Sequence, residues 1–346
     1  MAENRARVLI IGGGSVGIMA AYALYAGGNA DVTVVMRSNF AQVEKTGISI
    51  DSIDHGHDIK GWRPDTILDS VPDVVREKLP LFDFVVVTTK NIPDVSPTAE
   101  EIVTPAIVNE KTVIVLLQNG LNIEKPMIRR FPSNPILSSV SYISATQLSH
   151  GKILHTDPDY QRIGPFSSSL VSPEVAEDAA RRYLTVYNPH NALNVVFDDN
   201  VTRTRWSKLV YNASYNSVAA ILRMDTARMR MSQHIIDDLI RPIMLEVIAA
   251  ANACGITDLP KDLPDRAIRA DSTDTGFRPS MCQDADNGNL MEIEYIVGEP
   301  LREGQSRGVQ MPALKTIYYL LKGLQLHAKE ARGMWEPKFC SNNPYK

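Results

Sequence analysis

The chain has 346 residues, of which 44% are hydrophobic and 22% are charged, and its formal net charge is -4 at pH 7. This composition is typical of a globular protein that is long enough for two domains. Nucleic acid is not an expected partner, because the chain has no excess of basic residues to neutralise a phosphate backbone. The longest apolar runs are strand-length, far below the roughly 20 residues that cross a bilayer, so we expect no membrane span.

The N-terminal sequence MAENRARVLIIGGG enters an apolar strand within a few residues and leaves no room for a signal peptide. We therefore expect a cytoplasmic protein. The three cysteines, Cys254, Cys282 and Cys340, have neither metal-ligand spacing nor the even count of a disulfide framework. We expect them to be structural or incidental, and we expect no metal site.

The first predicted elements are a strand over residues 7–11, a glycine loop, and a helix over residues 15–26. The loop has the G-x-G-x-x-G spacing, which provides a tight turn, close backbone approach to a pyrophosphate, and tight helix packing. Because a strand precedes it and a helix and second strand follow, we favour a dinucleotide-binding loop over a merely glycine-rich turn. The expected phosphate-binding residues are Gly12, Gly14, Ser15, Val16 and Gly17.

The end of the second strand, DVTVVMR, indicates which cofactor binds. An acidic residue there would bond the ribose 2′-hydroxyl of NAD, whereas an arginine favours the 2′-phosphate of NADP. The sequence has Arg37 at this place, so we expect NADP(H). The alternative is a solvated arginine that begins a loop.

Two further strands, over residues 82–88 and 112–117, are nearly continuous apolar runs typical of central parallel strands. Lys90 follows the first and Asn119 the second. In an open α/β sheet, ligands lie beyond the carboxyl ends of the strands, which places both side chains at the cofactor crevice. An Asn-Gly turn is the equally weighted alternative for Asn119.

Beyond residue 132 the pattern becomes strand-like and polar, in ILSSVSYISATQ, GKILHTD, YQRIGPF and ALNVVFDD. We expect these segments to be antiparallel strands that extend the sheet. A helix begins near Pro173 between them, with Ser172 as its N-cap. From about residue 200 to residue 328 the period is helical, and this change sets the predicted domain boundary. The expected architecture is an N-terminal Rossmann-type α/β domain, residues 1–198, and an all-helical domain, residues 199–346.

The helical stretch TRWSKLVYNASYNSVAAI places Lys208, Asn212 and Asn216 at successive four-residue steps. On an α-helix, three such residues lie on one stripe, and the residues between them are largely apolar. The row is either a solvated edge or the wall of a buried polar site, and periodicity alone does not separate these readings.

Ser280 and Glu292 are twelve residues apart, so a continuous helix would point both to the same side. The sequence DNGN between them weakens helix propensity, and a bend is the alternative. A glutamate near Lys208 would favour the charged ammonium. Taken alone, Glu292 is more simply a surface carboxylate next to Glu294.

These motifs together resemble the ketopantoate reductase (2-dehydropantoate 2-reductase) family. The resemblance rests on GGGSVG, TTK, QNG, WSKLVYNASYN, and RPSMCQD with Glu292 in MEIEYI, and it covers roughly residues 7–324. It implies NADPH-dependent reduction of 2-dehydropantoate to (R)-pantoate, in pantothenate biosynthesis. A small 2-keto acid is then the expected partner, and a homodimer remains open.

The resemblance also implies roles for individual residues. Lys208 would be the general acid, Glu292 would orient it, and Asn119 would position substrate and nicotinamide. The remaining implied ligands are Asn212, Asn216 and Ser280 for the substrate, and Gly12, Gly14, Gly17, Arg37 and Lys90 for the cofactor.

Two positions depart from the family pattern. Pro93 stands where the family commonly has a glutamine, and Thr226 stands where it uses an asparagine for substrate. The second departure concerns the choice of keto acid more than the reduction itself. We therefore keep two alternatives: a reductase of another 2-keto acid or ketone, and a non-catalytic NADP(H)-binding redox sensor.

Overall fold

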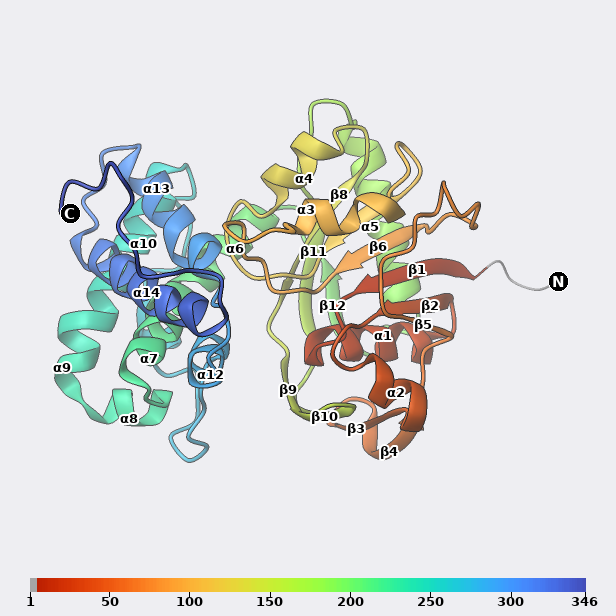
Figure 1. Ribbon diagram of the computed structural model, residues 1–346, viewed down its shortest axis with the longest axis horizontal. Coiled ribbons are helices and arrows are strands. Elements are labelled where there is room, and N and C mark those ends of the chain that lie inside the picture. The colour runs from red at the N-terminus through yellow and green to blue at the C-terminus, as the bar shows by residue number, and fades with distance from the viewer. Residues whose placement is uncertain (1–4) are drawn as a thin grey trace. The chain divides into compact units, whose positions relative to one another are not determined.

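The computed structural model describes residues 5–346, which divide into two compact units after Thr204 (Figure 1). The division falls inside helix α6 (Val201–Tyr211), a few residues beyond the place where the hydrophobic period changes. The reason lies in the first turn of this helix. The Thr204 hydroxyl donates a 2.5 Å hydrogen bond to Asp198, and Val201 is buried, so this turn is attached to the first unit.

The first unit is built on an eight-stranded sheet of order β12-β11-β8-β7-β6-β1-β2-β5. Neighbouring strands from β5 to β8 are parallel, β11 is antiparallel to β8, and β12 is parallel to β11. The strands are β1 (Ala6–Ile11), β2 (Ala30–Val35), β5 (Thr66–Leu68), β6 (Phe84–Val87), β7 (Val113–Leu116), β8 (Ile136–Ser141), β11 (Tyr160–Pro165) and β12 (Asn194–Phe197).

A second sheet of order β4-β3-β10-β9 corrects the expectation that every later strand extends the first one. Strands β9 (Ser144–Ser149) and β10 (Lys152–Asp157) form a hairpin, and β10 pairs in parallel with β3 (Ile48–Ser52), which pairs with β4 (Gly56–Trp62). The alternation of side chains indicates a strand and its faces but not its partner. The β3–β10 pairing joins segments about a hundred residues apart, such as Ile50 and Ile153, and no local pattern reports it.

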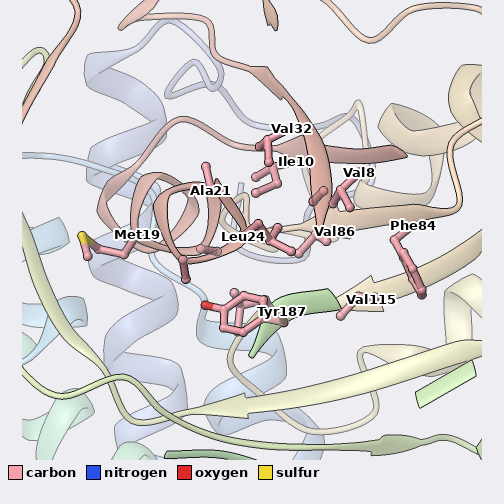
Figure 2. Close-up of a cluster of buried hydrophobic side chains, with 14 of the residues drawn as sticks. Val8, Ile10, Met19, Ala21, Leu24, Val32, Phe84, Val86, Val115 and Tyr187 are labelled. Carbon is pink, nitrogen blue, oxygen red and sulfur yellow. The ribbon is translucent and has the colours of Figure 1, made fainter. Parts of the chain in front are cut away.

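Among the described residues of the first unit, five α-helices precede α6. They are α1 (Ser15–Gly27), α2 (Phe40–Thr46), α3 (Ala99–Val103), α4 (Glu124–Arg130) and α5 (Pro173–Tyr187), with a 3-10 turn η1 (Thr104–Ala106) after α3. Figure 2 shows Ala21 and Leu24 of α1 in the cluster that contains Val8 and Val86 of the central strands. Ser172 caps α5 as predicted, because its hydroxyl accepts from the Val175 N–H at 3.4 Å. The contacts of Ala21 and Leu24 hold α1 against the central strands.

All the regular elements among the described residues of the second unit are helical, which confirms the predicted fold class. After α6 these are η2 (Asn212–Asn216), α7 (Ser217–Leu222), α8 (Thr226–Met231), α9 (Gln233–Ile235), η3 (Ile236–Ile240), α10 (Arg241–Ala253), α11 (Leu263–Ile268), α12 (Ser280–Asp286), η4 (Glu294–Gly298), α13 (Glu299–Gln305) and α14 (Pro312–Ala331). The three η segments are π-helical turns. Across residues 5–346, no helix combines the length and the apolar character that crossing a membrane requires.

Candidate active site

The glycine loop between β1 and α1 is shaped by two close backbone approaches. Gly12 has a φ of +129°, and a Cβ on it would lie 2.4 Å from Oγ1 of Thr88. A Cβ on Gly17 would lie 2.0 Å from the carbonyl oxygen of Gly12. The Thr88 hydroxyl is 3.1 Å from the same oxygen, to which it donates. These two glycines therefore allow the helix to begin directly against the strand ends.

Gly14 differs from the other two glycines because it faces open space. A Cβ on Gly14 would meet no heavy atom of the described residues within 4 Å beyond its chain neighbours. Gly14 is the N-cap of α1, and the first turn of this helix contains no acidic residue. Free N–H groups at a helix N-terminus bind anions such as phosphate. The open backbone at Gly14 therefore fits a pyrophosphate.

Ser15 and Val16 can contribute to such a site only through the backbone. The Ser15 hydroxyl donates a 2.7 Å hydrogen bond to the carbonyl oxygen of Ala145, in β9. The Val16 side chain packs against the hydrophobic core of the first unit. Their N–H groups belong to the first turn of α1, where the helix leaves such donors available.

Asn39 holds the glycine loop in place, a role that the sequence did not indicate. Its buried side-chain amide donates to the carbonyl oxygen of Gly13 at 2.6 Å and to Gln147 at 2.9 Å. A Cβ on Gly13 would lie 2.3 Å from Cβ of Met36, so the loop runs directly over the end of β2. Arg37 lies just beyond the end of β2, and its side chain is exposed. An asparagine two residues past an arginine is too common to have singled out this contact.

Lys90 and Asn119 follow neighbouring parallel strands, β6 and β7, as predicted. Lys90 is exposed and Asn119 is half-buried. Gln118 connects the two loops, since its amide donates to the carbonyl oxygen of Thr89 at 2.7 Å. The sheet order passes from β2 through β1 to β6, so the strand order reverses next to the glycine loop. Such a reversal is the usual ligand crevice of an open α/β sheet.

Lys208 lies half-buried on α6 in the second unit, and desolvation of its amine changes its chemistry. Burial, followed by the positive charge of Arg205, lowers the pKa of Lys208 from 10.5 to about 7. The carboxylate of Glu292 acts in the opposite direction but does not prevail. The reference pKa of lysine, near 10.4, would keep the amine protonated throughout the neutral range. The structure instead gives a lysine that exchanges its proton near neutral pH.

Asn212 and Asn216 are buried, at 7% and 4% exposure, so the polar row is not a solvated edge. The row is also not a regular α-helical stripe, because residues 212–216 form the π-helical turn η2. Its wider ring alters the rotation between residues four apart, and such turns are frequent at functional sites. Oδ1 of Asn216 has no hydrogen-bond partner among residues 5–346. A buried acceptor of this kind fits a ligand that donates a hydrogen bond.

Ser280 and Glu292 are not on one helix, which corrects the continuous-helix expectation. Helix α12 begins at Ser280 and ends at Asp286, and Gly288 has a φ of +64° in the connection that follows. Glu292 precedes η4 and is only 4% exposed, whereas Ser280 is half-buried. Burial therefore excludes a surface carboxylate at Glu292. The helix-weakening sequence DNGN was the correct signal for the break.

Glu294, two residues further, has a different environment from Glu292. It accepts from Arg302 at 2.9 Å, from the Tyr318 hydroxyl at 2.9 Å and from Lys322 at 2.8 Å. These hydrogen bonds lower the pKa of Glu294 even though burial opposes them. Glu294 is thus fixed in a structural ion-pair network that connects η4, α13 and α14.

Thr226, one of the two positions that depart from the family pattern, begins helix α8 and is 3% exposed. Its backbone N–H donates to the carbonyl oxygen of Phe277 at 3.0 Å. Its hydroxyl has no hydrogen-bond partner within the part of the chain that the structure describes. Asn216 and Thr226 are thus two buried polar side chains of the second unit with hydrogen-bonding capacity to spare.

Comparison with known proteins shows which family has this arrangement of residues. Two family models match the chain: Ketopantoate reductase PanE/ApbA over residues 8–168, and Ketopantoate reductase PanE/ApbA C terminal over residues 200–325. The uncharacterized protein YDL144C of Saccharomyces cerevisiae is 34% identical, over 95% of this chain and 96% of its own. The chain belongs to the ketopantoate reductase family. This family consists of oxidoreductases that act on a keto or hydroxyl group.

Other relatives carry more specific names. The 2-dehydropantoate 2-reductase of Nostoc sp. is 26% identical, over 93% of this chain and 96% of its own. The crystal structure of 2-dehydropantoate 2-reductase from Methylococcus capsulatus has a TM-score of 0.77 and 28% identity, and it covers 93% of this chain and 97% of its own. A ternary structure of D-mandelate dehydrogenase with NADH and anilino(oxo)acetate has a TM-score of 0.78 at 20% identity, with coverage of 93% and 99%, and shares the fold.

Proposed function

We propose that this protein reduces a small 2-keto acid with NADPH, and that Lys208 supplies the proton. The observation that carries this proposal is the state of Lys208, a half-buried lysine whose pKa is lowered to about 7 by desolvation, against the opposing effect of the Glu292 carboxylate. A general acid is most effective when its pKa lies near the working pH. Membership of a family of keto-group oxidoreductases agrees with such a role.

NADPH, when bound, supplies the hydride, and the first unit provides the residues that fit it. The open backbone at Gly14 and the N–H groups of Ser15 and Val16 would hold the pyrophosphate at the start of α1. Arg37 and Lys90, both exposed beyond strand ends, would hold the 2′-phosphate and further negative charge. The exposed arginine supports NADPH over NADH.

Reduction of a ketone places negative charge on the carbonyl oxygen, and Lys208 would neutralise it. As the carbonyl carbon accepts hydride, the oxygen accepts the proton from Nζ of Lys208, which leaves a neutral amine. Glu292 would orient the ammonium before transfer. Asn119 would position the ketone and the nicotinamide.

The substrate that the family membership supports best is 2-dehydropantoate, reduced to (R)-pantoate. The buried amides of Asn212 and Asn216, together with the Ser280 hydroxyl, would bind its carboxylate and hydroxyl groups. Thr226 favours a second candidate, a different 2-keto acid or ketone, because a buried hydroxyl replaces a longer amide. Threonine reaches less far than asparagine, so a substrate with its polar group placed differently would suit this site.

The experiment is a substrate panel with NADPH, followed by nicotinamide absorbance. Rapid oxidation with 2-dehydropantoate supports the first candidate. Inactivity with 2-dehydropantoate but turnover of another keto acid supports the second. Tight NADPH binding without turnover on any member of the panel would instead support a redox sensor and contradict the reductase.

Self-association is a separate proposal. Tyr319 and Leu326 are exposed on α14 and lie seven residues apart on one side of that helix, and the exposed Leu320 lies about 100° further around it. An apolar stripe of this kind suits a homodimer interface. Sedimentation of the protein and of its Leu320→Lys variant checks this: a dimer that becomes monomeric supports the proposal, and an unchanged monomer contradicts it.

A further inference from the structure

Helix α14 and the connection between α12 and η4 line an open cavity of about 330 Å³ in the second unit. The connection contributes Gly288, Asn289 and Met291, and α14 contributes a face that begins at Leu324 and ends at Ala331. This volume lies at the lower end of the range of pockets that bind small molecules. The residues proposed to bind substrate or cofactor do not line this cavity.

Two sets of hydrogen bonds hold α14 to this connection. The buried amide of Gln325 accepts from the N–H of Met291 at 2.9 Å and donates to its carbonyl oxygen at 3.2 Å. Seven residues later, Arg332 donates to the carbonyl oxygen of Gly288 at 3.1 Å and to Oδ1 of Asn289 at 2.8 Å. Positions seven apart lie on the same side of a helix. The cavity is therefore bordered by fixed contacts at two levels of α14.

The side chains between these contacts are too small to fill the space. Ala328 and Ala331 line the cavity from α14, and Ala285 lines it from α12. Gly288 has a φ of +64°, and a Cβ on it would meet no heavy atom of the described residues within 4 Å beyond its chain neighbours. The buried side chain of Met291 adds to this apolar surface. The apolar part of a ligand would find a matching wall here.

The cavity also has a side that can bind an anion. Arg223 and His327 line it, and none of the described lining residues is acidic. The Arg223 guanidinium donates to Oδ1 of Asp286 at 3.2 Å through Nη1, while Oδ2 of the same carboxylate accepts from Nε of Arg278 at 2.9 Å. A guanidinium has five N–H donors, so Arg223 can bind a second carboxylate.

The backbone of Arg223 is unusual. Arg223 ends α7 in the left-handed region, with a φ of +57°, where an arginine is uncommon. Its carbonyl oxygen accepts from Nη1 of Arg278 at 3.2 Å, which helps to hold this conformation. Residues in such conformations cluster at ligand sites and switch regions. An arginine at a position better suited to glycine or asparagine agrees with a role for its side chain.

We propose that this cavity binds a small amphipathic carboxylate. The apolar part of the ligand lies against Ala328 and Met291, and its carboxylate binds Arg223. Met291 directly precedes Glu292, so the ligand contacts the segment that carries this glutamate. The inference goes beyond the proposed reduction and does not depend on it.

The test follows the methyl group of Met291 by NMR of the full chain labelled with 13C-methyl methionine. Its resonance is assigned by its loss in Met291→Leu. Phenylacetate is the probe, phenylacetamide is the uncharged control, and acetate is the control without an apolar part. We expect phenylacetate to shift the Met291 resonance saturably, with a Kd of roughly 1 mM or below, as suits a ligand of this size. Both controls should bind about tenfold more weakly or less.

Variants at both sides of the cavity should weaken this binding. Ala328→Trp fills the space and should abolish the saturable shift, and Ala331→Phe serves the same purpose if Ala328→Trp does not fold. Arg223→Gln should raise the Kd about tenfold, through the loss of one charge-assisted contact. Arg228→Gln is the matched control, because Arg228 is an exposed arginine of the same unit that pairs with Asp225. Its Kd should equal that of wild type.

Asn216→Ala separates this cavity from the proposed substrate site. We expect Asn216→Ala to keep the response of Met291 to phenylacetate. Loss of the response in Asn216→Ala together with its persistence in Ala328→Trp would place the probe in the substrate site and overturn the proposal.

Two further outcomes would also overturn it. A shift that never saturates, and that is equal in wild type and Ala328→Trp, would show that the cavity holds only solvent. A Met291 resonance that moves on dilution of the protein but not with phenylacetate would identify a second copy of the chain as the occupant. The titration needs neither NADPH nor a keto acid, so its failure and the failure of the reductase proposal are observed separately.

Discussion

The side-chain amide of Asn39 donates a 2.6 Å hydrogen bond to the carbonyl oxygen of Gly13 and so ties the end of β2 to the glycine loop. The same amide group is joined to Gln147 of the second sheet, with each side chain donating to the other. The loop that we propose to hold the cofactor phosphates is therefore positioned by side chains from two other parts of the first unit. Its geometry does not depend on glycine alone.

Replacement of Asn39 should weaken NADPH binding. We expect Asn39→Ala to leave the carbonyl of Gly13 and the amide of Gln147 without their partner, at a cost of about 1–3 kcal/mol in the free energy of unfolding. The loosened loop should raise the Kd for NADPH several-fold, which titration calorimetry measures. Gln42→Ala is the matched control, because Gln42 is exposed and donates only to Thr46 on the same helix. An Asn39→Ala protein with wild-type affinity would contradict the role of this contact.

Alanine at two of the loop glycines should separate folding from binding. Gly14→Ala has room for its methyl group and a φ of −78°, so we expect unchanged thermal stability but weaker NADPH binding, because the methyl group enters the phosphate site. Gly17→Ala places a methyl group 2.0 Å from the Gly12 carbonyl oxygen and should destabilise the first unit strongly. Thermal unfolding and NADPH titration of both variants check the pair. If both variants bind NADPH as tightly as wild type, the pyrophosphate does not bind at this loop.

Exchange of charge at Arg37 should change the cofactor preference. Arg37→Asp replaces a group suited to a 2′-phosphate with one suited to a ribose 2′-hydroxyl. We expect the ratio of kcat/KM with NADPH to kcat/KM with NADH to fall roughly tenfold or more. A change of this size corresponds to the loss of one charge-assisted interaction. Arg76→Asp, at an exposed site in the same unit, is the control for net charge. An unchanged NADPH preference would refute the 2′-phosphate role.

The sequence predicted the elements better than it predicted their partners. The glycine spacing and the apolar runs of β6 and β7 were sufficient for the central parallel sheet, because strands buried on both faces have a strong local signal. The second sheet escaped prediction. Its β3–β10 pairing joins distant segments, and the mostly exposed β4 lacks the apolar alternation that indicates a strand.

In the candidate site, too, the sequence predicted some features and not others. Residue types and order indicated Lys208, Glu292 and the two asparagines, but two properties could not be read from them. The first is the π-helical turn at residues 212–216, which has no distinct sequence period. The second is the lowered pKa of Lys208, which depends first on the burial of that side chain and then on the charge of Arg205. The helical spacing of polar residues predicts which side chains are adjacent, but it does not predict how deeply they are buried.

Removal of the Lys208 amine should slow catalysis strongly without removing cofactor binding. If Lys208 is the general acid, Lys208→Ala should lower kcat by roughly 10²-fold or more, the usual contribution of that role. The affinity for NADPH should stay close to wild type, because Lys208 is not among the residues proposed to hold the cofactor phosphates. Lys315→Ala, an exposed lysine on α14, is the control. A near-normal rate in Lys208→Ala would show that Lys208 is not the general acid.

The pH dependence follows from the lowered pKa of Lys208, which is about 7 in the folded protein against an ordinary value of 10.5. Between these values the unfolded chain binds a proton that the folded chain has released, so the contribution of Lys208 to stability increases as pH rises through this range. Catalysis has the opposite sign, because reduction requires the protonated amine. We expect kcat/KM for keto acid reduction to fall about tenfold per pH unit above neutrality, and alcohol oxidation to increase over the same range. Profiles of both directions check this, with NADPH and the best acid of the panel. A reduction rate that stays flat to pH 9 would show that Lys208 keeps its proton or is not the donor.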